Sequence, residues 1–171
     1  MRAKQAVGDA AADLPVAVAR CLCGAVRLEV VLPAFWAWHD HSRATQRAHG
    51  AAYATFVGTW RSRMRIVAGA EQLGCFADPA TNGVRHFCRS CGTHVLYERT
   101  PGARMVNIPR ALFEGRTGRE PRYHIAFAES PEWAYRGEAL GPLKNYPGVL
   151  WTGARRRAGK PPDETWPEPP P

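Results

Sequence analysis

Hydrophobic and polar residues alternate with a period of two in the middle of the chain, which is the pattern of half-buried β-strands. The clearest case is the segment 26–32, where four apolar side chains alternate with Arg27, Glu29 and Val31. Only two short segments, 42–49 and 110–114, favour helical turns. Glycine and proline separate the apolar runs, so we predict a mainly β fold of small antiparallel sheets. Further strands are expected at 53–57, 64–67, 94–97, 105–108 and 123–127.

The length of 171 residues predicts one domain with short extensions. We place the domain at residues 19–152, after an Ala-rich polar extension at 1–18. Residues 153–171 are basic and proline-rich, a composition that predicts a disordered tail. The sequence has no apolar run of about 18 residues and no signal-peptide core, so we expect a cytoplasmic protein without a membrane partner.

The net charge of +8 lies mostly within the predicted domain and comes mainly from arginine. These arginines are scattered, which does not favour a nucleic-acid partner. The exception is the group of Arg61, Arg63 and Arg65, which on a strand would share one face. That face is either a solvated edge or a contact for an anion such as a carboxylate or phosphate. A second open question is whether Phe35, Trp36, Trp38 and Trp60 line a pocket or pack in the core.

Two paired cysteine motifs give the strongest chemical indication in the sequence. Cys21-Leu-Cys23-Gly and Cys88-Arg-Ser-Cys91-Gly together supply four thiolates, the ligand set of a closed structural zinc site. Disulfides are rare in a reducing cytosol, so metal binding is the favoured interpretation over two unrelated buried pairs. We therefore predict one structural zinc ion, whose loss unfolds the chain. The fifth cysteine, Cys75, is expected to be a small core residue.

The residues around these motifs resemble the glutathione-dependent formaldehyde-activating (GFA) family, which shares its domain with centromere protein V. The resemblance covers residues 19–150 and includes Tyr123-His-Ile-Ala-Phe and Asn145-Tyr-Pro. It implies a β-tent fold with the four cysteines as structural zinc ligands. It also implies carbon–sulfur lyase activity on a glutathione–aldehyde adduct, with glutathione or a small thiol adduct as the ligand.

The family's enzymes hold a second, catalytic zinc with a Cys-x-Cys-x-x-Cys motif, and this chain departs from that motif. Asp40, Ser42 and Thr45 occupy the three cysteine positions. Three interpretations are open: a zinc-stabilised protein without activity, a different metal site, or a metal-free pocket that performs other chemistry. The first makes the protein a non-catalytic binding module for an anionic partner. The others would use Asp40 or the nearby histidines His39, His41 and His49 as ligands or proton carriers.

Overall fold

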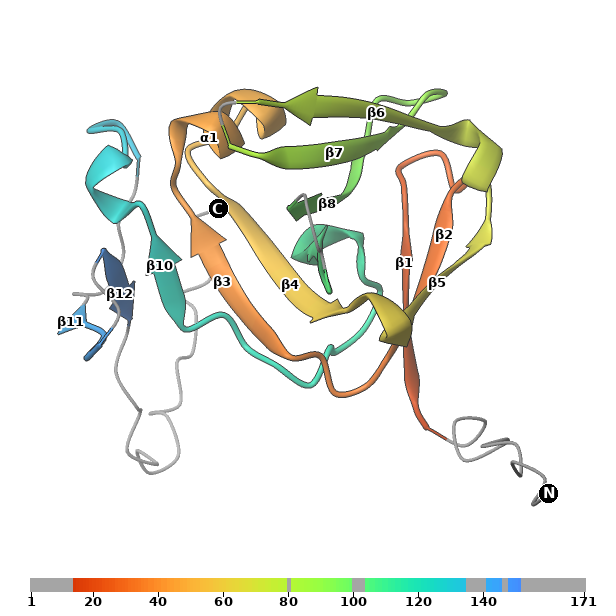
Figure 1. Ribbon diagram of the computed structural model, residues 1–171, viewed down its shortest axis with the longest axis horizontal. Helices are drawn as coiled ribbons and strands as arrows, with labels where there is room; N and C mark the ends of the chain where they lie inside the picture. The colour runs from red at the N-terminus through yellow and green to blue at the C-terminus, as the bar shows by residue number, and fades with distance from the viewer. Residues whose placement is uncertain (1–13, 80, 100–103, 135–140, 146–147, 152–171) are drawn as a thin grey trace, which may run out of the picture.

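The computed structural model describes residues 14–79, 81–99, 104–134, 141–145 and 148–151, and it confirms a mainly β fold of small antiparallel sheets (Figure 1). The predicted tail at 153–171 and most of the predicted extension at 1–18 lie outside the described residues. The first strand includes residues 16–18. The longest described helix has seven residues, so no helix in this part of the chain could cross a membrane.

Strands form two sheets. The smaller sheet has the antiparallel order β1-β2-β5, with β1 at Val16–Arg20, β2 at Arg27–Val31 and β5 at Met64–Ala68. The larger sheet has the order β11-β12-β10-β3-β4-β9-β8-β7-β6, and all its pairs are antiparallel except β10 with β3. Its strands are β3 (Trp36–Asp40), β4 (Ala54–Trp60), β6 (Leu73–Asp78), β7 (Gly83–Cys88), β8 (His94–Arg99), β9 (Met105–Pro109), β10 (Tyr123–Ile125), β11 (Gly141–Pro142) and β12 (Val149–Trp151).

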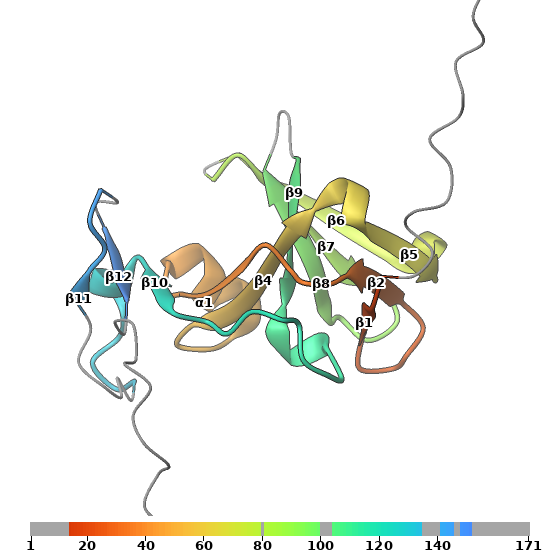
Figure 2. The ribbon, with the colours of Figure 1, turned by 90° about the horizontal axis from the view of Figure 1, so that it is seen from below.

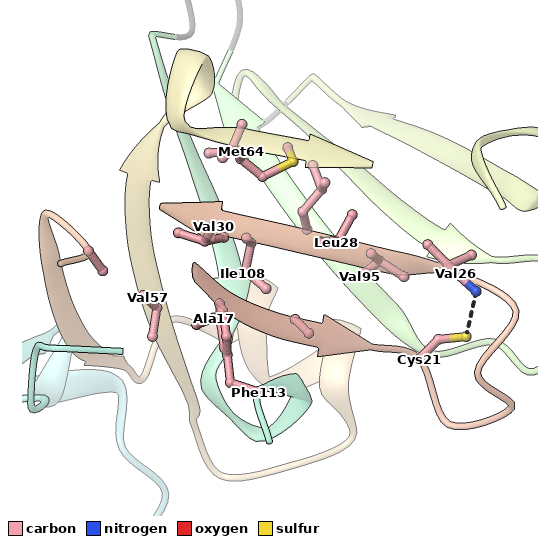
Figure 3. Close-up of a cluster of buried hydrophobic side chains, with 14 of the residues drawn as sticks. Ala17, Cys21, Val26, Leu28, Val30, Val57, Met64, Val95, Ile108 and Phe113 are labelled. Carbon is pink, nitrogen blue, oxygen red and sulfur yellow. Dashed lines mark hydrogen bonds between the residues drawn. The ribbon is translucent and has the colours of Figure 1, made fainter. Parts of the chain in front are cut away.

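The main hydrophobic core lies where the small sheet packs on the larger one. Leu28 and Val30 of β2 are fully buried, as the period-two pattern predicts, and they belong to one cluster with Val95 and Ile108 of the larger sheet (Figure 3). Figure 2 shows β10, β11 and β12 at the opposite end of the molecule from this small sheet. Burial of this cluster therefore fixes β1, β2 and β5 against the middle of the larger sheet.

The single α-helix of the described residues, α1 (Arg43–His49), begins and ends as its sequence predicts. Ser42 is its N-cap and accepts a hydrogen bond from the Thr45 N–H at 3.3 Å. Gly50 ends it in the left-handed conformation, with φ of 59°, and donates to the Gln46 carbonyl. The helix connects β3 to β4 and places its side chains beside β6 and β7. Four short 3-10 turns complete the described fold: η1 (Arg61–Arg63), η2 (Ala70–Gln72), η3 (Arg110–Leu112) and η4 (Phe127–Glu129).

The prediction that Arg61, Arg63 and Arg65 share one face of a strand is wrong. Arg61 and Arg63 lie in the turn η1 rather than on a strand, so the alternation of side chains that would align them with Arg65 does not occur. Arg63 donates to the Leu32 carbonyl at 2.9 Å, and Arg65 donates to the Glu29 carboxylate at 2.6 and 2.8 Å. These arginines therefore have partners within the fold.

Two further expectations concern cysteine and the aromatic residues. Cys75 is exposed on β6, the edge strand, so its assignment to the core is wrong. Trp38 is buried, with only 2% of its surface exposed, whereas Phe35 and Trp36 line a surface cleft of about 430 Å³. Trp60 is exposed and packs against Phe35, so the aromatic group is divided between the core and the surface.

Candidate functional site

The four paired cysteines meet where the turn after β1 faces the β7–β8 turn. Their sulfur atoms all lie within 4.8 Å of one another, although the two pairs are far apart in sequence. Gly24 and Gly92 make the turns possible, because both adopt a left-handed φ, of 76° and 71°. Their N–H groups donate to the carbonyls of Cys21 and Cys88, and this bends each loop around the cluster.

The spacing of the sulfur atoms fits a tetrahedral metal ion. The Sγ atoms of Cys21 and Cys23 lie 3.5 Å apart, and those of Cys23 and Cys88 lie 3.8 Å apart. Four ligands at the usual zinc–sulfur distance of about 2.3 Å would be separated by about 3.8 Å. The four cysteines are therefore positioned to hold one metal ion, as their spacing in the sequence predicts.

Hydrogen bonds around the cluster shift the pKa values of its cysteines in opposite directions. The Val26 N–H donates to the Cys21 sulfur at 3.3 Å (Figure 3). The hydrogen bond from Thr93, whose Oγ1 is 3.1 Å from the sulfur, lowers the pKa of Cys91 to about 5. The Ala25 N–H lowers the pKa of Cys23, but hydrogen bonds with the other thiols outweigh it and raise that pKa to about 12. Without a cation the crowded sulfurs share protons, so a bound dication would be needed for all four to ionise.

Asp40, Ser42 and Thr45, the positions that the resemblance matches to catalytic cysteines, form a hydrogen-bonded group of their own. The Asp40 carboxylate accepts from the Ser42 N–H at 2.9 Å and from the Thr45 hydroxyl at 3.0 Å. Asp40 and Thr45 are buried, and Ser42 caps α1. These side chains serve as the start of the helix, so their polar atoms are used within the fold.

The nearby histidines divide into two groups. His41 lies against His124 of β10, with ring nitrogens 2.9 Å apart, and His39 is 2.8 Å from the Thr55 hydroxyl. His49 instead contacts His94, with ring centroids 4.6 Å apart. Among the described residues, none of these groups brings three ligand atoms together as the cysteines do. Asp40, His39, His41 and His49 therefore do not form one cluster of ligand atoms in the described part of the chain.

A cleft lies beside α1, and several of the residues that face it belong to no sequence motif. Arg85 of β7, Tyr97 of β8 and His94 reach this region from strands distant from the helix in the sequence. Burial, with smaller effects of nearby His49 and Arg85, lowers the pKa of His94 to about 4. The imidazole of His94 is therefore neutral near pH 7. No local motif marks these residues, because their proximity depends on the pairing of β7 and β8.

The fold is a mainly β, β-tent type domain, and its four clustered cysteines are positioned to hold one metal ion. The sequence profile of the family described as "Glutathione-dependent formaldehyde-activating enzyme" matches residues 16–129. The chain therefore belongs to the GFA family. It is similar to a crystal structure of a Rhodobacter sphaeroides protein, a structural-genomics target. The two are 27% identical with a TM-score of 0.50, and the match covers 58% of this chain and 89% of the other. Comparison with curated proteins gave no match.

Proposed function

We propose that this chain is a zinc-stabilised GFA-family protein that binds a small thiol–aldehyde adduct of the glutathione type without a second, catalytic zinc. The observation that supports it most directly is the hydrogen bonding among Asp40, Ser42 and Thr45. An aspartate committed to a helix start and two neutral hydroxyls are poor replacements for three thiolates. The protein would act as a binding module for an anionic ligand of this class.

Zinc is the metal we assign to the four cysteines. Four thiolates in a tetrahedral arrangement suit zinc, and such closed sites are structural because no position is open to a substrate. Cys21 and Cys88 are buried, so the ion would tie the end of β1 to the β7–β8 turn. A reduced site of this kind fits the cytoplasmic location expected from the sequence.

Metal stoichiometry tests the first part of this proposal. Elemental analysis of the purified protein is expected to give one zinc per chain, retained until the protein unfolds. A triple variant, Asp40→Cys with Ser42→Cys and Thr45→Cys, is expected to raise the content to two. Two metal ions per chain in the unmodified protein would overturn the proposal, because the hydrogen-bonded group would then hold a metal.

A second candidate is a carbon–sulfur lyase that uses acid–base chemistry instead of a second zinc. The observation that favours it is the neutral imidazole of His94 in the cleft. As a general base it would take the hydroxyl proton of the adduct, a carbonyl would form, and the carbon–sulfur bond would break. The thiolate would leave and recover a proton from the histidine.

The lyase is tested by the rate at which S-hydroxymethylglutathione forms and decomposes. Because formaldehyde and glutathione combine spontaneously, the measured rate must exceed the reaction without protein. A rate above this background that falls in a His94→Gln variant would support the lyase. A rate equal to the background would remove it and leave the binding module, whose ligand affinity is measured by calorimetry.

A further inference from the structure

Arg85 is a buried cation without an acidic partner in the described structure. It lies on β7 opposite Phe76 of β6 and Tyr97 of β8, and its guanidinium carbon is 5.4 Å from the centre of the Tyr97 ring. Only 9% of its surface is exposed. Its Nη1 atom is fully buried and has no hydrogen-bond partner among the described residues. Arginine stays charged under all ordinary conditions, and burying an unpaired guanidinium costs free energy. A bound anion would offset that cost.

Two adjoining clefts beside α1 give an anion access to this cation. Their volumes are about 160 Å³ and about 570 Å³, and Ala44, Thr81 and Arg85 line both of them. The larger one is within the usual range for small-molecule sites. Phe76 and Ala48 add apolar surface to it. The arrangement combines an apolar wall with one central cation, which is typical of sites for small amphipathic acids.

The charges around the clefts leave a positive excess. Arg43, Arg47 and Arg99 lie at the walls with Arg85, against two acidic residues. Both acidic groups already accept hydrogen bonds within the fold, Asp40 from the Thr45 hydroxyl and Asp78 from the Thr81 hydroxyl at 2.8 Å. Neither forms an ion pair with Arg85 among the described residues. Among the described residues, the walls of these clefts therefore carry four arginines and two carboxylates.

We propose that Arg85 binds a carboxylate of the ligand in this cleft, with Arg43, Arg47 and Arg99 drawing the acid into it. The planar guanidinium donates two parallel hydrogen bonds to a carboxylate, a geometry that lysine cannot reproduce. This inference rests on the proposed function, because a glutathione adduct has two carboxylates. The inference adds Arg85 as the residue that recognises one of these carboxylates. The apolar wall formed by Phe76 and Ala48 would contact the uncharged part of the ligand.

Calorimetric titration with S-methylglutathione, a stable adduct analogue, tests the assignment. Arg85→Gln is expected to weaken binding roughly ten- to hundredfold, the effect of losing hydrogen bonds to a charged group. Arg85→Lys is expected to restore only part of the affinity. Arg116→Gln is the matched control, because Arg116 lines the separate cleft beside Trp36, and it is expected to bind like the unmodified protein. Circular dichroism and zinc content verify that each variant is folded.

A second measurement keeps the test decisive if Arg85→Gln does not fold. The dimethyl ester of S-methylglutathione lacks both carboxylates and is expected to bind the unmodified protein at least tenfold more weakly. Wild-type affinity in a folded Arg85→Gln variant overturns the role of Arg85 while leaving the proposed function intact. Equal affinity of the acid and the ester overturns the role of Arg85 and also the proposal that the bound ligand is recognised as an anion.

Failure of the proposed function would give results different from failure of the Arg85 assignment. If the protein does not bind S-methylglutathione but binds succinate or inorganic phosphate in an Arg85-dependent manner, the anion site stands and the glutathione class is wrong. If none of these probes shows Arg85-dependent binding, the anion site is overturned as well.

Discussion

The Thr45 hydroxyl donates a hydrogen bond to the Asp40 carboxylate, and the two oxygens lie 3.0 Å apart in the buried start of α1. The resemblance to the family matches these two positions to cysteines of the catalytic zinc motif. In this chain the loop is held by a side-chain hydrogen bond and a helix cap. The local fold therefore has an explanation that does not involve a metal.

Removing this hydrogen bond should destabilise the protein without changing its metal content. Thr45→Val keeps the shape of the side chain but leaves a buried carboxylate oxygen without this donor, so we expect a loss of about 1–3 kcal/mol in the free energy of unfolding. In an Asp40→Ala background the same substitution should lower the free energy of unfolding much less, because the carboxylate that Thr45 contacts is already absent. Urea denaturation of the four proteins measures this coupling. A change in zinc content would show that Thr45 is a metal ligand after all.

Loss of one cysteine ligand should have a far larger effect. Structural zinc contributes about 10–16 kcal/mol in small zinc-binding peptides, more than most domains have as net stability. Cys88→Ser is therefore expected to give an unfolded or insoluble protein without bound metal. Cys75→Ser is the control, because Cys75 is exposed on the edge strand and lies outside the cluster. A folded Cys88→Ser protein with full zinc content would refute the four-thiolate site.

The sequence predicts those features whose cause is local. The paired cysteines, the period-two burial of Leu28 and Val30, and the capped helix after Ser42 all follow from neighbouring residues. The predicted alignment of Arg61 with Arg65 failed for a local reason as well, because a 3-10 turn interrupts the strand. Such a turn has no strong signature in a run of polar and apolar residues that also fits a strand.

The cleft could not be predicted because it depends on strand register. Arg85, Tyr97 and Phe76 become neighbours only when β7 pairs with β8 and β6 in the observed alignment. His124 likewise meets His41 because β10 runs parallel to β3, an uncommon pairing in an otherwise antiparallel sheet. A single sequence gives the faces of each strand but not which strands are neighbours.

The buried histidines predict that stability decreases in mild acid. Burial, with the nearby charge of Arg85, lowers the pKa of His49 to about 4, from an ordinary value of 6.5. The unfolded chain therefore binds a proton that the folded chain does not, as pH falls from about 6.5 to about 4. Stability is fully present above this range and is lost within it. We expect the free energy of unfolding, measured with excess zinc, to fall less steeply with acid in His49→Gln. An unchanged dependence of the free energy of unfolding on pH would show that His49 does not contribute to the loss of stability in acid.

The close approach of Trp36 to Gly58 makes Gly58 one of the least replaceable residues of the larger sheet. These residues are cross-strand partners in β3 and β4, and a Cβ atom at position 58 would lie 2.6 Å from the Trp36 ring. That ring also packs against Trp38, at 4.6 Å between centroids, in a cluster that includes Phe56, so a shift of the ring would disturb these contacts. Gly58→Ala is therefore expected to lower the free energy of unfolding by about 1–3 kcal/mol, the usual penalty of overpacking.

Two experiments test this contact. The first compares alanine substitutions at Gly58 and Gly115, and the second adds a substitution that relieves the clash at Gly58. Gly115→Ala should change stability by less than about 0.5 kcal/mol, because a Cβ atom at position 115 would have no neighbouring atom within 4 Å. Adding Trp36→Leu to Gly58→Ala should recover part of the lost stability, since the smaller side chain makes room for the new methyl group. Thermal unfolding followed by near-ultraviolet circular dichroism reports both stability and tryptophan packing. Equal effects at Gly58 and Gly115 would mean that the approach of Trp36 to the β4 backbone does not constrain the sheet.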